Sequence, residues 1–193
     1  MKHLPGEIAY TSMMNSSVPA LMPQMVGFYG SAKFHNASLF VDDKLDCTFV
    51  HNQISTSAEE TIRDKEAYET ELRQFGKEVR HHHEDNGTYD VAEHREETNK
   101  NKQTLTFCGV DSNNQNGRAE NRVKIICNPA RVILIHAIHR WPEVVKESLW
   151  PYSIPLATCI RKNHKINKQR TTPIEKLTGL SQSFDAKNNH AFG

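Results

Sequence analysis

The stretch "RHHHEDNGTYD", residues 80–90, places three consecutive histidines directly ahead of two acids, Glu84 and Asp85. It predicts the end of a short strand, because "DNG" is a turn signal. Side chains on a strand alternate between two faces. One face carries His81, His83 and Asp85, and the other carries His82 and Glu84. The three histidines therefore cannot bind one metal ion together. We interpret them as the polar cover of a half-exposed strand that delivers Asp85 to its end.

The segments around this strand predict an α/β domain. Stretches rich in β-forming residues end at polar turn residues, and a helical pattern that opens at Ser55–Ser57 and stops at Gly76 lies between them. This order indicates a mixed central sheet of about five strands, flanked by helices. The expected strands include 37–43 and 47–54, paired as an antiparallel hairpin, 77–85 and 103–110; the expected helices are 55–76, a short one within 88–102, 118–140, and one that begins near Trp141 with Pro142 in its first turn.

Length and composition limit the class of protein. With 193 residues the chain suits one domain, which we assign to residues 1–179, followed by a disordered tail at 180–193. Its 24 basic and 23 acidic residues give a net charge of +1, so net charge alone identifies no polyanion binder. No apolar run is long enough to span a membrane, and the N-terminus lacks the apolar core of a signal peptide. We therefore expect a soluble intracellular protein, nuclear or cytoplasmic, with no membrane partner.

The four cysteines lie far apart in the sequence, with no CxxC pair among them. This spacing supports neither a zinc ribbon nor a disulfide framework. We expect buried free thiols at Cys47, Cys108, Cys127 and Cys159.

A second acid gives Asp85 a candidate role. Glu120 follows 35 positions later, in "NQNGRAENRVK", behind a predicted strand and a glycine-containing loop and in the first turn of a long helix. Two-metal phosphoryl transfer needs carboxylates that converge on two Mg²⁺ ions about 4 Å apart, and carboxylates are the hard oxygen ligands that Mg²⁺ prefers. This layout is that of a polynucleotidyl transferase, and we expect the two carboxylates within about 8 Å of each other.

Several longer stretches carry a resemblance to a known family. They are "PGEIAYTSMMNSSVPALMPQMVGFY", "LFVDD", "HHEDNG", "QTLTFCGVDSNNQNGRAENR", "ILIHAIHRWPEVVKESLWPY" and "RTTPIEKLTG", from about Pro5 to Gly179. In them the chain resembles the integrase catalytic core of copia-type long-terminal-repeat retrotransposon polyproteins, which has a ribonuclease-H-like fold. The combination of "DNG", "QNGxAE" and "TPIEKLTG" makes the resemblance specific.

The resemblance implies three catalytic acids that bind Mg²⁺ or Mn²⁺, with DNA as the partner, and it leaves a homo-oligomer open. Asp85 and Glu120 match the second and third acids. Aligned on "PG" and "SSVP", the family's first Asp falls on Ser12, which is neutral and a poor Mg²⁺ ligand. We interpret Asp42, in "FVDD", as a residue of the neighbouring sheet, although its substitution for the missing Asp stays open. The chain is therefore expected to be a degenerate, impaired copy.

The long helix adds candidate DNA contacts. At 100° per residue, Lys124 and Arg131 fall on nearly the same line as Glu120, beside an apolar stripe. These two residues, with Arg122, are our candidate nucleic-acid-binding residues, although Lys124 and Arg131 could equally be solvated surface charges. Pro129 is expected to interrupt the helix at a cost of roughly 3 kcal/mol. The basic stretch at 160–170 either adds non-specific DNA contacts or forms a solvated face.

Two functions of different classes follow. The first is an integrase core for DNA integration by two-metal strand transfer, with Asp85 and Glu120 as catalytic and metal-binding residues, and impaired because of Ser12. The alternative is a non-catalytic remnant with weak, non-specific nucleic-acid or partner binding. The family's zinc module would precede the core, and this chain begins just before the first core strand. We therefore expect DNA binding that is weak and salt-sensitive.

Overall fold

The computed structural model describes residues 3–20, 33–85, 87, 89–108, 116–164 and 171–181. Within them, five strands form one sheet in the order β3-β2-β1-β4-β5. The strands are β1 (Ile8–Ala20), β2 (Phe34–Asp42), β3 (Thr48–Gln53), β4 (His81–Glu84) and β5 (Thr104–Phe107), and the helices are α1 (Ala58–Arg73), α2 (Ala92–Lys100), α3 (Gly117–Arg140), η1 (Glu147–Leu149), α4 (Trp150–Asn163) and α5 (Pro173–Thr178). β1, β2 and β3 are antiparallel, whereas β4 is parallel to β1 and to β5. The predicted mixed sheet flanked by helices is confirmed.

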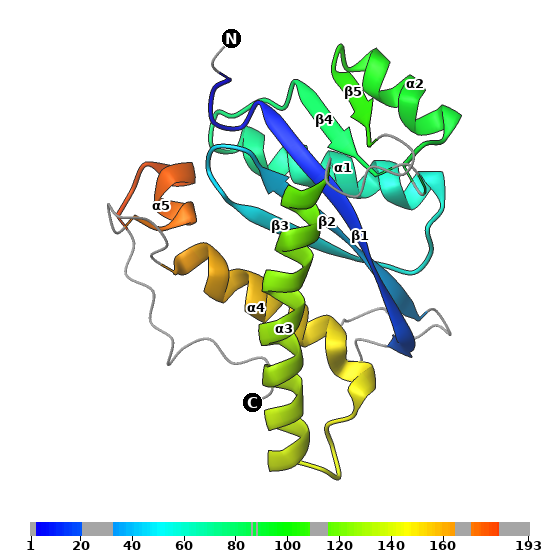
Figure 1. Cartoon of the computed structure of the whole chain (residues 1–193), viewed down its shortest axis with the longest axis vertical. Coiled ribbons are helices and arrows are strands. Elements are labelled where there is room, and N and C mark those ends of the chain that lie inside the picture. Colours follow the sequence, from blue (N-terminus) through cyan, green and yellow to red (C-terminus); the bar gives the residue numbers. More distant parts are fainter. Residues whose placement is uncertain are drawn as a thin grey trace.

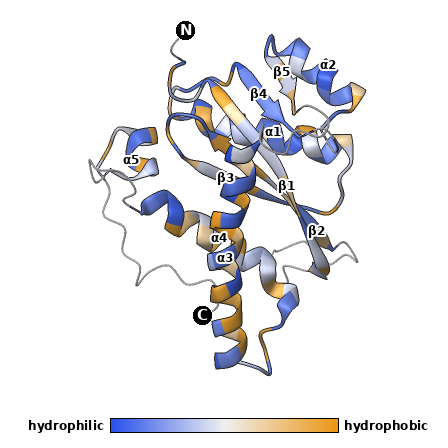
Figure 2. Ribbon diagram, viewed as in Figure 1, coloured by the Kyte–Doolittle hydropathy of each residue, from blue (hydrophilic) through white to orange (hydrophobic). Residues whose placement is uncertain are grey.

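Helices cover the two faces of the sheet (Figure 1). One core lies between the sheet and α3 and α4, where residues such as Leu39 and Val41 meet Ile126, Ala130 and Ile154. The second lies on the opposite face, where Phe40 and Phe49 pack against Tyr68 of α1. The predicted apolar stripe of the long helix is therefore its buried side. Figure 2 shows apolar residues along much of the second half of α3.

Helix α1 begins where its sequence predicts. Ser57 is the N-cap, and its hydroxyl accepts a hydrogen bond from the Glu60 amide. The Glu60 carboxylate in turn accepts bonds from the amides of Ile54 and Ser55, 2.8 and 2.7 Å away. Past the end of the helix, Gly76 adopts a φ of 66°, which glycine reaches without steric cost. These local signals fix both ends of the helix that covers the second core.

Two predictions for the helical half are wrong. The last long helix begins at Trp150 with Pro151 in its first turn, and not near Pro142. The residue before a proline is disfavoured in the α region, so α3 ends at Arg140 and the chain turns at Trp141. The Trp150 indole then donates a hydrogen bond to the Val18 carbonyl, 2.8 Å away, which fixes the start of α4 against β1.

The long helix is also not interrupted at Pro129, because α3 runs unbroken from Gly117 to Arg140. Pro129 lies on the exposed side of α3. There, solvent can hydrogen-bond the carbonyl of Ile125, which lacks its amide partner. The proline therefore removes one hydrogen bond without ending the helix.

Some of the remaining predictions concern residues that the structure describes, and others concern residues outside them. All four cysteines are free thiols; Cys47 and Cys108 are buried and the other two are half-buried. Among the described residues, no helix combines the length and apolar character needed to cross a membrane. Most of the loop at 111–117, residues 165–170 of the basic stretch, and residues 182–193 of the expected tail lie outside the described residues. The domain limit at residue 179 stays a prediction.

Candidate functional site

Ser12 lies on β1, and Asp85 follows β4, the parallel neighbour of β1. The last pair between β1 and β4 is Tyr10 with His83. Continuing this register by two residues places Ser12 beside Asp85, just past the end of β4. Paired residues in a sheet point to the same face, as the rings of Tyr10 and His83 do, with their centroids 5.4 Å apart. The register therefore agrees with the alignment that puts Ser12 where the first acid is expected.

The N-terminus of α3 is attached to the same part of β1. The side-chain amide of Asn116, the N-cap residue, donates a hydrogen bond to the Thr11 carbonyl, 2.9 Å away. Two residues on, the Arg118 guanidinium lies over the Tyr10 ring, 5.6 Å from its centroid, and pairs with Asp43. Glu120 follows in the first turn of α3 and is exposed to solvent. An acid at this position is also favoured by the helix dipole.

The pKa of the Cys108 thiol is affected by both predicted acids, Asp85 and Glu120. Burial raises the pKa of Cys108, and the charges of Asp85 and Glu120 raise it further. The Cys108 thiol also donates a hydrogen bond to the carbonyl of Glu84, 3.3 Å away, which places it beside the end of β4. Both carboxylates therefore lie within electrostatic range of Cys108. Their predicted separation of about 8 Å stays a prediction.

Asp42 has a structural role, because its carboxylate accepts hydrogen bonds from three backbone amides. Its buried carboxylate accepts hydrogen bonds from the amides of Gly6 and Lys44, 2.8 and 2.9 Å away, and from that of Leu45. Burial raises the pKa of Asp42, although these bonds lower it in part. Asp42 lies opposite Ala9, three residues from Ser12, which is about 10 Å along the strand. Asp42 therefore stabilises the turn after β2 and is poorly placed to replace a carboxylate at position 12.

The candidate cations of α3 divide into two kinds. Arg122 is buried, and its guanidinium pairs with Asp46 and donates to the Thr48 hydroxyl, 3.1 Å away. Its expected contact with DNA is therefore not supported, because its donors are used inside the protein. Lys124 and Arg131 are exposed. In the basic stretch, Arg161 pairs with Asp46 at 3.1 Å and Lys162 with Glu71 at 3.2 Å, so both hold α4 against neighbouring segments.

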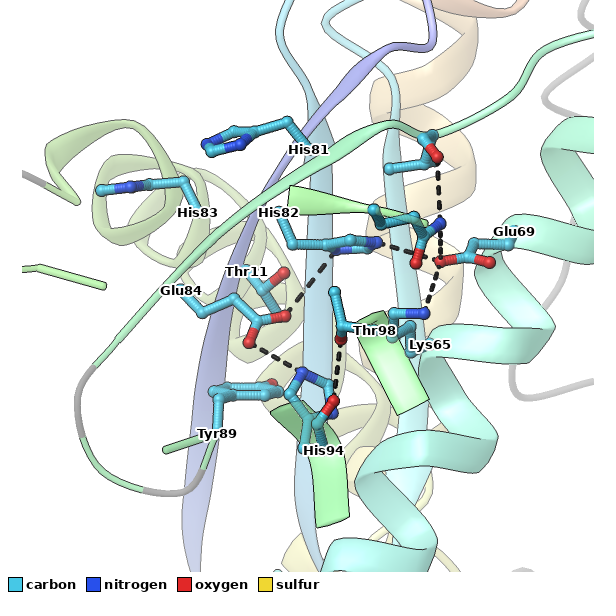
Figure 3. A network of polar contacts seen from close by, with 12 residues as sticks. Thr11, Lys65, Glu69, His81, His82, His83, Glu84, Tyr89, His94 and Thr98 are labelled. Atoms are coloured by element: carbon cyan, nitrogen blue, oxygen red, sulfur yellow. Dashed lines mark hydrogen bonds and ion pairs between the residues drawn. The ribbon is translucent and has the colours of Figure 1, made fainter. Parts of the chain in front are cut away.

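Behind the candidate site lies a buried polar network that the sequence did not reveal (Figure 3). Glu69 of α1 contacts Lys65, His82 and Gln103 at 2.8–3.0 Å. Beside it, the Glu84 carboxylate is 2.8 Å from His94 of α2. His82 and Glu84 are fully buried, whereas His81 and His83 are half-buried on the other face. The predicted alternation along β4 is confirmed, but its inner face carries buried polar contacts of His82 and Glu84 that hold the strand from behind.

The comparisons with known proteins identify the fold. No family model and no curated protein sequence matches the chain. Among solved structures, the catalytic core domain of HTLV-2 integrase, in complex with magnesium in a trimeric form, matches with a TM-score of 0.60 and 17% identity over 89% of this chain and 96% of that chain. The chain has the fold of an integrase catalytic core.

Other integrases agree. The BIV integrase catalytic core matches with a TM-score of 0.58 and 13% identity over 90% of this chain and 95% of that chain. The simian T-cell lymphotropic virus intasome, in complex with PP2A regulatory subunit B56 gamma, matches with a TM-score of 0.64 and 13% identity over 96% of this chain and 59% of that chain. Identities this low establish the ribonuclease-H-like integrase fold alone.

The donor set of the integrase-like site suits one divalent metal ion better than two. Asp85 and Glu120 supply two carboxylates, and Ser12 supplies a neutral, largely buried hydroxyl. Within the described ranges, no cluster of three or more His, Cys, Asp or Glu side chains is arranged to hold a metal ion. Mg²⁺ keeps several waters and is often bound through one or two carboxylates together with substrate phosphates. The residues present therefore fit a single, weakly held Mg²⁺ or Mn²⁺.

Proposed function

We propose that the chain is the catalytic core of a DNA integrase of the copia retrotransposon type, impaired because Ser12 replaces the first catalytic acid. The observation that supports this proposal is the attachment of the N-terminus of α3 to β1, beside the parallel strand β4 whose register leads from Tyr10 and His83 toward Ser12 and Asp85. The resemblance of "DNG" and "QNGxAE" to the family supports the roles of the two acids.

In this proposal Asp85 and Glu120 are the catalytic and metal-binding residues. A bound Mg²⁺ or Mn²⁺ would polarise the phosphate that is attacked and lower the pKa of the attacking hydroxyl. Asp85 follows a strand held from behind by buried hydrogen bonds, and Glu120 belongs to a helix attached to β1, so both residues lie next to well-anchored elements. With a carboxylate missing at position 12, the site supplies two negative charges where the family supplies three.

DNA would follow the exposed side of α3 in this proposal. Lys124 lies one turn beyond Glu120 and Arg131 two further turns along, about 6 and 16 Å from it at 1.5 Å per residue. Both are exposed, and charges of this kind contact phosphates without reading base sequence. The retroviral structures include trimeric and dimeric integrase cores and an intasome, which makes a homo-oligomer the partner to test beside DNA.

The second candidate function is a non-catalytic remnant that keeps weak nucleic-acid or partner binding. Its supporting observation is the neutral side chain of Ser12 at the centre of the site, together with the commitment of Asp42 to the turn after β2. Both candidates predict DNA binding, and they differ in metal binding and turnover.

The test compares the natural chain with Ser12→Asp. In a calorimetric Mg²⁺ titration we expect one weak site in the natural chain and at least tenfold tighter binding in Ser12→Asp, because a third carboxylate joins the site. Asn15→Asp is the matched control, since it adds the same charge to an exposed position on β1. Asp85→Asn in the Ser12→Asp background should remove the gain.

The activity assay is DNA strand transfer on a preprocessed donor end with Mg²⁺ or Mn²⁺. We expect no detectable product from the natural chain, and measurable product from Ser12→Asp if the chain is an impaired integrase. A Mg²⁺ affinity that changes in neither Ser12→Asp nor Asp85→Asn would overturn the assignment of the site. Turnover by the natural chain that Asp42→Asn abolishes would show instead that Asp42 is the first acid.

A further inference from the structure

The outer face of β4 forms part of a pocket next to the candidate site. A cavity of about 360 Å³ is lined by His3, Ile8, Tyr10, His81 and His83. Ile8 and Tyr10 come from β1, and the last two histidines come from the parallel neighbour β4. Their alternation puts these side chains on the same face as Ser12 and Asp85. In Figure 3, His81 and His83 point away from the buried network.

Two of the three imidazoles of the pocket, those of His81 and His83, are held in place by β5. The ring nitrogens of His81 lie 2.7 Å from the Thr104 hydroxyl and 3.0 Å from the Thr106 hydroxyl. His83 shares the Thr106 hydroxyl at 2.8 Å, and the edge of its ring meets Tyr10. These bonds occupy the ring edges and fix the orientation of each ring. The pocket is therefore a rigid wall of flat rings and not a set of loose surface side chains.

Its position relates the pocket to the two acids. His83 precedes Asp85 by two residues and His81 precedes it by four, so the rings lie about 7 and 13 Å from it along the strand. A DNA strand that reaches the carboxylates therefore has one or two further nucleotides within range of the pocket. The pocket continues the candidate site along the sheet face.

The chemistry of the lining selects among ligands. Burial lowers the pKa of His81, and the neighbouring His82, His83 and His3 lower it further against an opposing effect of Glu84. Both ring nitrogens of His81 already contact threonine hydroxyls, so the ring offers little to a phosphate. No metal-binding cluster of three or more side chains exists among the residues the structure describes. Flat rings beside Tyr10 and Ile8 instead suit the stacking of a nucleobase, which is tolerant of sequence.

We propose that this pocket receives an unpaired nucleobase of the DNA strand whose backbone lies at Asp85 and Glu120. The inference rests on the proposed DNA-processing function and adds to it a subsite that holds a single-stranded end. It assigns His81 and Tyr10 to substrate positioning and gives the outward histidines of the "HHH" run a role apart from metal binding.

The test measures binding of labelled DNA duplexes by fluorescence anisotropy at low salt. Each duplex carries a two-nucleotide overhang, of either polarity, with normal bases or with abasic residues. We expect the natural chain to bind one base-bearing overhang about 5- to 100-fold more tightly than its abasic counterpart, the range typical of one base–ring stack. His81→Ala should remove this preference, whereas His81→Phe, which keeps a flat ring, should retain most of it.

His35→Ala is the matched control, because His35 is an exposed histidine on β2, outside the pocket. Equal affinity for base-bearing and abasic overhangs would overturn the inference, as would a preference that survives His81→Ala or is lost in His81→Phe. If His81→Ala does not fold, the comparison of base-bearing with abasic overhangs and the His81→Phe variant still test the inference. Salt-sensitive duplex binding without base preference would reject the pocket alone, and no DNA binding at all would reject the proposed function with it.

Discussion

The side-chain amide of Asn116 donates a hydrogen bond to the carbonyl of Thr11 across 2.9 Å, between residues far apart in the sequence. This one contact joins the N-cap of α3 to the strand that carries Ser12. Asn116 is almost fully buried, so the bond is shielded from water. The position of Glu120, one turn into the helix, depends on this junction.

Replacement of Asn116 by Ala should therefore affect both stability and the site. The Thr11 carbonyl would be left buried without this donor, at a cost of about 1–3 kcal/mol in the free energy of unfolding. Urea titration measures that loss, and Mg²⁺ calorimetry should show weaker binding in the Ser12→Asp background. Asn121→Ala, at an exposed position on the same helix, should change neither quantity.

The salt dependence of DNA binding should distinguish the basic residues of α3 that contact DNA from the one that stabilises the fold. Lys124→Ala and Arg131→Ala should each weaken DNA binding and reduce the slope of log K against log salt by about 1, without changing stability. Arg122→Ala should instead lower the free energy of unfolding by about 1–3 kcal/mol, because the Thr48 hydroxyl loses its buried donor while Asp46 keeps only Arg161. Equal slopes for the natural chain and Lys124→Ala would place the DNA elsewhere.

Glu69 should make the fold sensitive to acid. Burial alone would raise its pKa, but the hydrogen bonds and charges of His82 and Lys65 outweigh burial and lower the pKa of Glu69 from 4.5 to about 2. Because the pKa is lowered in the folded state, this stabilisation is present above pH 4.5. It is lost as the pH falls from there toward 2, by about 3 kcal/mol in total.

Urea unfolding between pH 7 and pH 3 measures the contribution of Glu69. Glu69→Gln should lose about 3–5 kcal/mol at pH 7, because Lys65 is fully buried and would keep an unpaired charge. The same variant should show a flatter acid limb than the natural chain. Glu66→Gln, at an exposed position on the same helix, should leave the pH profile unchanged.

Asp64, on the same helix as Glu69, should have the opposite effect on the pH dependence of stability. Burial raises its pKa from 3.8 to about 6, more than the nearby Ser38, Arg63 and Gln53 side chains lower it. A raised pKa means that the fold favours the protonated acid, so this contribution is present below pH 3.8 and lost as the pH rises through 6. Asp64→Asn should therefore be more stable than the natural chain at pH 8, by about 2–3 kcal/mol, and similar to it at pH 4. Identical pH profiles would show that the carboxyl is not desolvated.

The fold was predictable because its signals are local. The hairpin, the Ser57 cap and the apolar stripe of α3 each lie within a few turns of chain, and the order of elements then selects a mixed sheet. The roles of Asp85 and Glu120 rest on the motifs around them and stay predictions. The burial of Arg122 was missed, although two residues on a helix correspond to about 200°, which turns it away from Glu120 and toward the core.

The buried network was not predictable from the sequence, for a physical reason. "HHHE" is as polar as an exposed strand, and only the tertiary structure brings Glu69 and Lys65 of α1 to His82, and His94 of α2 to Glu84. A buried polar group is tolerated when its partners are present, and those partners come from other elements. The pocket of His81 and His83 depends on β5 in the same way, since Thr104 and Thr106 orient its rings.

Pro129 provides the last prediction. Because α3 is continuous through it, Pro129→Met should leave the structure unchanged, restore the amide donor for the Ile125 carbonyl and raise the free energy of unfolding by about 1–3 kcal/mol. Combined with Ser12→Asp, it should increase strand transfer above that of Ser12→Asp alone, since α3 carries Glu120. Asn128→Met, at the adjacent exposed position, is the control for added apolar surface. An unfolding free energy that rises equally in both variants would show that the proline costs this helix nothing.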